Sequence, residues 1–233
     1  ETFLRDAGLI DANGAAMPEY AGRIQLSGHS LGGHLALWTA SQHADLVARV
    51  DTFNGAGLNY QHPVVVLLET LWNETIAPGA NALVGGAIHN YYAEPGPEFT
   101  ATGLFAYRPG EHVPLFIEHA PGEVLATHDM SKLVDALAAY RLFAAIDPSL
   151  DAAQMGAILE AASHDAQGSI AAAVRALGAS LGGAYAGVSD PLELHAMLAP
   201  RLEAGIWAGA RIVPAAGTAV GDVVLEQSDT GSA

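Results

Sequence analysis

Residues 24–33 read Ile-Gln-Leu-Ser-Gly-His-Ser-Leu-Gly-Gly, and this stretch decides the fold of the chain. Its apolar beginning, residues 24–26, predicts a short strand. From residue 31 onward the apolar side chains recur at helical spacing. The residues expected to share one helix face are Leu31, Leu35, Trp38 and Ala40. The stretch therefore predicts a strand that passes through a tight turn into a helix, with Ser30 at the turn.

The turn carries the pattern Gly-x-Ser-x-Gly, from Gly28 to Gly32, followed by Gly33. Such a turn lifts a serine hydroxyl clear of the sheet, and we expect side chains at Gly28 and Gly32 to collide with neighbouring backbone. The backbone N–H of Leu31 would then point at a developing oxyanion, helped by the positive end of the helix. The pattern predicts a nucleophile at Ser30. The alternative is a glycine-rich strand-to-helix turn without chemistry.

Strands and helices alternate along the first 150 residues. The expected strands cover residues 24–26, 46–53, 83–92 and 113–118. Residues 64–76 are apolar and ambiguous, with a helix favoured at their end. Residues 130–145 predict a long helix that stops at Asp147-Pro148, because a residue before proline avoids the helical region. This alternation predicts an α/β fold, with a parallel sheet covered by helices.

The composition shifts after residue 148. Three Ala-rich helices are expected over residues 151–162, 167–181 and 192–204. We therefore predict a first domain over residues 1–150 and a helical extension over residues 151–212. Residues 213–233 are small and polar, and we expect a loosely ordered tail there.

The charge of the chain excludes one class of partner. Its 233 residues include 25 Asp and Glu but only 9 Lys and Arg, a formal net charge of -16. Nucleic-acid binding needs clustered cations, so we expect no such partner. The chain has no cysteine, no metal-ligand spacing and no apolar run that spans a bilayer. We expect neither a cofactor nor an integral membrane segment, and an uncharged acyl ester remains a suitable substrate.

Several stretches resemble a known group of enzymes. Residues 24–33 look like the serine signature of lipases, and residues 51–57, Asp-Thr-Phe-Asn-Gly-Ala-Gly, resemble the next strand and turn of class 3-type lipases. His128-Asp129-Met130 before the long helix resembles lipase-like domains of large secreted bacterial proteins, which often carry calcium-binding repeats elsewhere. The resemblance covers residues 24–148.

The resemblance implies an α/β-hydrolase fold and a serine hydrolase that cleaves carboxylic esters. The substrate would be a triacylglycerol or another lipid or small acyl ester, and the protein would be extracellular. Any calcium-binding repeats would lie elsewhere in the parent protein. In this fold the catalytic residues follow one another as Ser, acid and His along the chain.

Ten histidines compete for the role of general base. His128 fits best, because it precedes a long helix late in the domain, and the family resemblance indicates the same residue. His119 is the main rival and His112 a weaker one. We expect His29 to pack or hydrogen-bond within the turn and His34, on the following helix, to be structural.

The acid should follow the strand over residues 83–92 and orient the histidine ring. Glu94 comes directly after this strand, and Glu98 follows one turn later. Lipases usually have Asp here, whereas this chain has no Asp between Asp51 and Asp129. Both glutamates stay candidates, and the alternative is that they are exposed loop carboxylates.

Only residues 1–22 precede the first strand, which is too short for the upstream strands of the fold. We therefore expect a fragment truncated at its N-terminus, with the second oxyanion donor missing. Two other functions stay open. One is a non-catalytic module of a large secreted adhesion protein or exoprotein, and the other is a peptidase or thioesterase on the same fold.

Overall fold

The computed structural model describes residues 1–57, 87–94, 108–118, 128–162, 168–214 and 223–227. The chain divides into two compact units, one of residues 1–92 with 97–113 and one of residues 93–96 with 114–233. The sequence-based boundary near residue 150 falls inside the second unit. The apolar stretch 64–76, Glu98 and His119 lie outside the described residues.

The first unit is built on a four-stranded sheet with the strand order β1-β2-β3-β4. Its elements are α1 (Thr2–Asp6), β1 (Ile24–His29), α2 (Leu31–Gln42), β2 (Val47–Phe53), β3 (Ile88–Glu94) and β4 (Glu111–Phe116), the last two reaching into the second unit. β1 pairs in parallel with β2, and β2 pairs in parallel with β3. The predicted α/β fold with a parallel sheet and flanking helices is confirmed.

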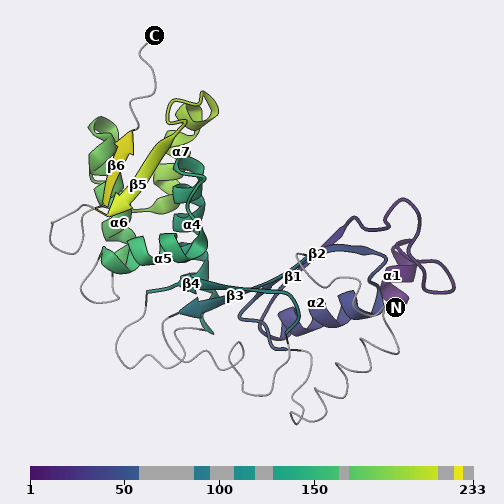
Figure 1. Ribbon diagram of the computed structural model, residues 1–233. Helices are drawn as coiled ribbons and strands as arrows, with labels where there is room; N and C mark the ends of the chain where they lie inside the picture. The colour runs from purple at the N-terminus through teal and green to yellow at the C-terminus, as the bar shows by residue number, and fades with distance from the viewer. Residues whose placement is uncertain (58–86, 95–107, 119–127, 163–167, 215–222, 228–233) are drawn as a thin grey trace. The chain divides into compact units, whose positions relative to one another are not determined.

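α2 lies along one face of β1 and β2 (Figure 1). Its buried residues, Gly33, Ala36, Leu37 and Ala40, are mostly small and pack towards Val47, Val50 and Ile88 of the sheet. The helix itself is confirmed, but Ala40 does not share a face with the other three residues expected there. Leu31, Leu35 and Trp38 are 65%, 54% and 53% exposed, whereas Ala40 is buried. Small residues let the helix backbone approach the sheet, and this close packing decides which face is covered.

The second unit is mainly helical. It contains α4 (Met130–Ile146), α5 (Ala152–Ala161), α6 (Ser169–Leu181), the 3₁₀ turn η2 (Gly183–Tyr185) and α7 (Pro191–Glu203). Three aspartates cap these helices: Asp129 accepts from the Ser131 N–H, Asp190 from that of Glu193, and Asp151 forms a capping box with Gln154. These caps satisfy N–H groups that a helix start leaves unpaired. All four predicted helices are confirmed.

A hairpin completes the second unit. β5 (Ala210–Pro214) pairs in antiparallel fashion with β6 (Val223–Gln227). The small, polar composition from residue 213 onward predicts a loosely ordered tail, whereas residues 223–227 form a strand. Five residues carry little periodicity of their own, and the strand exists because β5 supplies its hydrogen-bond partners. Across the described parts of the chain, no helix is long and apolar enough to cross a membrane.

Candidate active site

The turn between β1 and α2 holds Ser30 in a strained backbone conformation, with φ 55° and ψ -121°. Within the described part of the chain, only Ser30 and Asn54 have positive φ without being glycine. Such conformations cost on the order of 1–3 kcal/mol and persist only where the surroundings enforce them. Ser30 is half-buried at the start of α2. Strain of this kind is frequent at catalytic residues.

Backbone hydrogen bonds hold Ser30 from both sides. Its N–H donates to the carbonyl of Phe53 at 3.1 Å. Its carbonyl accepts from Gly33 N–H at 3.0 Å and from Ala56 N–H at 3.1 Å. The end of β2 and the loop that follows it therefore fix the position from which the Ser30 hydroxyl can act.

The glycines of the turn differ in their roles. A Cβ on Gly28 would stand 2.2 Å from the carbonyl carbon of Gly32, so the expected collision is confirmed there. At Gly32 the expectation is wrong: apart from its chain neighbours and the backbone of its own helix, no atom of the described residues lies within 4 Å of where its Cβ would stand. The second requirement for glycine is at Gly33, where a Cβ would meet the Cα of Gly55 at 2.7 Å.

The backbone N–H of Leu31 lies at the beginning of α2. The first four N–H groups of a helix have no acceptor within that helix, and the helix dipole places positive potential there. Leu31 directly follows Ser30, and its side chain is largely exposed. The arrangement is suited to an oxygen that gains negative charge after attack by the Ser30 hydroxyl.

The loop of residues 54–57 supports the turn. Asn54 is fully buried with φ 45°, and its N–H donates to the Tyr91 carbonyl at 2.8 Å. His34 Nδ1 hydrogen-bonds to the Gly57 carbonyl oxygen at 2.8 Å, which agrees with the structural role expected for it. The buried guanidinium of Arg108 donates through Nε to the carbonyl of Gly55 at 2.9 Å.

A buried polar pair ties the same region to the sheet. The Thr52 hydroxyl donates to Asn90 Oδ1 at 2.9 Å, and Asn90 Nδ2 donates to the carbonyl of Pro109 at 2.7 Å. Sequence reasoning missed Thr52, Asn90 and Arg108. No motif marks them, because the pairing of strands and the path of the chain bring together residues that lie far apart in the sequence.

Charged side chains gather on neighbouring strands of the sheet. Arg49 Nε donates to Asp51 at 2.7 Å, and His89 lies 3.4 Å from Asp51 and 3.7 Å from Glu111. Burial raises the pKa of the Tyr91 phenol, and the negative charge of Asp51 adds to this effect. No group of three ligand-type residues within the described ranges could hold a metal ion.

The other candidate residues belong to different parts of the chain. His128 is half-buried just before α4, and Glu94 is exposed at the end of β3, where its carbonyl accepts from Ile117 N–H at 2.9 Å. Both belong to the second unit, whereas Ser30 and His112 belong to the first. His112 Nε2 lies 3.3 Å from the Arg108 carbonyl. The assignment of the base and the acid stays a prediction.

Comparison with known families bears on the first unit. Residues 2–94 match the family described as "Putative esterase". This segment is similar to esterases. The esterase family is an α/β-hydrolase family, so the match agrees with the sheet and with the strained serine turn at Ser30. The esterase match covers less than half of the chain and does not single out the class 3 lipases. The search of curated proteins gave no match.

Proposed function

We propose that the chain is a serine hydrolase that cleaves carboxylic esters, with Ser30 as its nucleophile. The observation that carries the proposal is the positive φ of Ser30 at the turn from β1 into α2. The surrounding backbone leaves room only for glycine at Gly28, as a nucleophile turn requires. The similarity of residues 2–94 to esterases supports the same chemistry.

In the proposed reaction the Ser30 oxygen attacks the ester carbonyl carbon and forms a tetrahedral intermediate. A histidine takes the serine proton and returns it to the alcohol that leaves, so an acyl-serine remains. Water, activated by the same histidine, then releases the acid and restores the serine. The N–H of Leu31 stabilises the negative oxygen in both steps.

We assign the base to His128, because it precedes the long helix late in the domain and the sequence resemblance indicates the same residue. His119 and His112 are the rivals. Glu94 or Glu98 would orient the imidazole ring. Chain order and the sequence resemblance support these assignments.

A lipid-type substrate is the finer part of the proposal. Leu31, Leu35 and Trp38 form an exposed apolar stripe on α2 that begins at the residue next to Ser30. An acyl chain laid on this stripe would remove apolar surface from water, about 25 cal/mol per Å². This favours acyl esters of lipase type over short polar esters. An extracellular location is proposed on the sequence resemblance alone.

The test is labelling by a fluorophosphonate probe together with hydrolysis of p-nitrophenyl esters. We expect Ser30→Ala to abolish labelling and to lower kcat/KM by about a thousandfold or more, as removal of a nucleophile does. Ser27→Ala is the matched control, because Ser27 is an exposed serine on β1, the strand that leads to Ser30. It should label and turn over like the wild type.

Variants His128→Ala, His119→Ala and His112→Ala, compared in the same assay, identify the base. Esters of increasing acyl length, compared between the wild type and Trp38→Ser, test the apolar stripe. A folded wild-type protein that neither labels nor hydrolyses any ester would overturn the proposal in favour of a non-catalytic module.

A further inference from the structure

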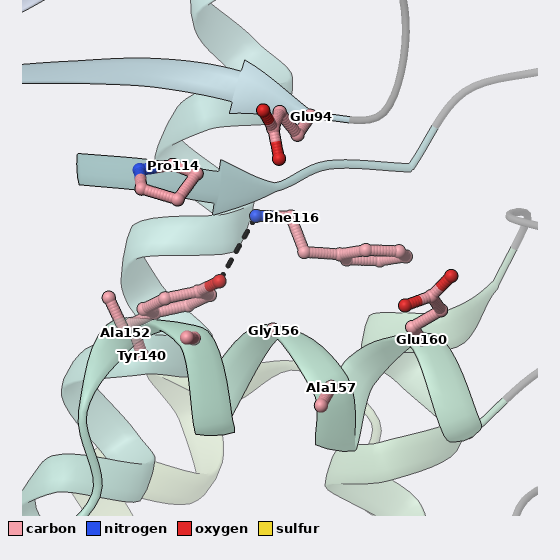
Figure 2. Close-up of a pocket in the computed structure, with 9 residues that line it drawn as sticks. Glu94, Pro114, Phe116, Tyr140, Ala152, Gly156, Ala157 and Glu160 are labelled. Atoms are coloured by element: carbon pink, nitrogen blue, oxygen red, sulfur yellow. Dashed lines mark hydrogen bonds between the residues drawn. The ribbon is translucent and has the colours of Figure 1, made fainter. Parts of the chain in front are cut away.

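The second unit contains a pocket of about 330 Å³, and Glu94 is the only one of its lining residues that the proposed ester hydrolysis involves. It lies between the end of β3, β4, α4 and α5 (Figure 2). Its volume falls within the range of small-molecule sites, roughly 300–1,000 Å³. All its lining residues belong to one compact unit.

One wall of the pocket is α5, which presents only small side chains there. Ala152, Ala153, Gly156 and Ala157 line the cavity. A Cβ on Gly156 would stand 3.0 Å from the hydroxyl oxygen of Tyr140. Gly156 therefore lets α5 approach the Tyr140 hydroxyl closely, and the alanines beside it leave space that larger side chains would fill.

The opposite wall is aromatic and held in place. The Tyr140 hydroxyl oxygen accepts a hydrogen bond from the backbone N–H of Phe116 at 3.0 Å. Both residues are buried, and both line the pocket. Burial raises the pKa of the Tyr140 phenol, and the charge of Glu94 adds to this effect, so the ring stays neutral near neutral pH. A neutral ring presents a face of negative potential.

The only charged lining residues of the pocket are carboxylates. Glu94 enters from the strand side and Glu160 from α5 (Figure 2), and the described lining includes no Lys, Arg or His. We propose that this pocket binds a small organic ammonium ion with an apolar body. The ammonium group would lie near Glu94 and Glu160, and the apolar body would lie against Phe116, Tyr140 and the alanines of α5.

Charge and shape together select this class of ligand. Two carboxylates repel an anion, and aromatic faces attract a cation within about 6 Å. A bare metal ion needs several converging oxygen ligands, and no such group exists among the described residues. A neutral apolar ligand would pack against the apolar walls but would form no ion pair with either carboxylate.

The experiment is a titration of the isotope-labelled protein, followed by NMR chemical shifts, with hexylammonium and with hexanol. We expect hexylammonium to bind at least tenfold more tightly than hexanol and to shift the signals of Phe116, Tyr140 and Ala157. Glu94→Gln and Glu160→Gln should each weaken hexylammonium binding by about three- to fivefold, the size of an exposed ion pair. Both variants should leave hexanol unchanged.

Ala157→Leu should weaken both probes, because leucine occupies the cavity at a position exposed enough to keep the fold. Glu203→Gln, on exposed α7 surface outside the pocket, is the matched charge control and should change nothing. Equal binding of hexanol and hexylammonium, or hexylammonium binding that Ala157→Leu leaves intact, would overturn the proposal. Ser30→Ala should bind hexylammonium normally, so this result does not depend on whether the protein is an esterase.

Discussion

Gly33 and Gly55 lie backbone against backbone, since a Cβ on Gly33 would stand 2.7 Å from the Cα of Gly55. The backbone of the first turn of α2 thus lies in direct contact with the backbone of the loop after β2. Ser30 is held between them, with its carbonyl bonded to Ala56 of that loop. The strained serine turn therefore depends on a contact that only two glycines allow.

Alanine substitution should change the free energy of unfolding differently at Gly33 and at Gly32. Gly33→Ala is expected to lower the free energy of unfolding by about 1–3 kcal/mol, the usual effect of overpacking. Gly32→Ala should leave it unchanged or raise it by up to about 1 kcal/mol, because the site is open and alanine favours helix. Urea denaturation of both variants measures the difference. Equal destabilisation by the two substitutions would contradict the assigned contact.

The loop of residues 54–57 should also depend on Arg108. Arg108→Met keeps an apolar stem but removes the hydrogen bond from Nε to the Gly55 carbonyl. We expect a loss of about 1.5–3 kcal/mol, the range for hydrogen bonds to charged groups. Arg49→Met is the control: the Arg49 side chain is 42% exposed, and its ion pair with Asp51 should contribute less than about 1 kcal/mol. A similar loss in both variants would argue against a special role for Arg108.

The Tyr140 hydroxyl should stabilise the second unit through one backbone group. Tyr140→Phe leaves the buried N–H of Phe116 without its acceptor, and such a loss costs about 1–3 kcal/mol. Tyr20→Phe, at an exposed tyrosine of the first unit, should cost less than about 0.5 kcal/mol. Thermal unfolding by circular dichroism compares the two. A stable Tyr140→Phe protein would mean that water replaces the hydroxyl.

The carboxylate of Asp147 should make the stability of the fold depend on pH. Its carboxylate accepts hydrogen bonds from the hydroxyl and N–H of Ser149 and from the N–H of Ile212, and Arg211 lies 3.3 Å away. Burial acts to raise the pKa of Asp147, but these partners outweigh it and hold the pKa below its ordinary value.

A carboxylate whose pKa is lower in the folded protein stabilises the fold at pH values above the pKa of the unfolded chain, about 3.9 for Asp. This stabilisation is lost as the pH falls through the pKa of the folded protein. We expect the wild-type free energy of unfolding to decrease below about pH 4, and Asp147→Asn to flatten that decrease. Asp135→Asn, at an exposed position on α4, the helix that ends just before Asp147, should keep the wild-type slope. Denaturation at several pH values between 2.5 and 6 checks the prediction, and an unchanged slope in Asp147→Asn would contradict it.

Local signals predicted much of the fold and part of the candidate site. The strand before Ser30, the helix after it and the helices α4 to α7 follow from short-range patterns of apolar and Ala-rich residues and from Pro148. These patterns act within a few residues, so the sequence carries them directly. The restriction at Gly28 follows in the same way, because its nearest neighbours are Gly32 and Gly33, four and five residues away.

The remaining features needed contacts between distant residues. Which face of α2 is covered, why Gly33 rather than Gly32 must be glycine, and why Arg108 is buried beside Gly55 depend on where the sheet places β2 and the following loop. β6 likewise depends on pairing with β5. The sequence by itself determined the local conformations, above all the strand-turn-helix at Ser30. Only the tertiary structure decided packing and burial, because those energies arise between residues that the chain order does not bring together.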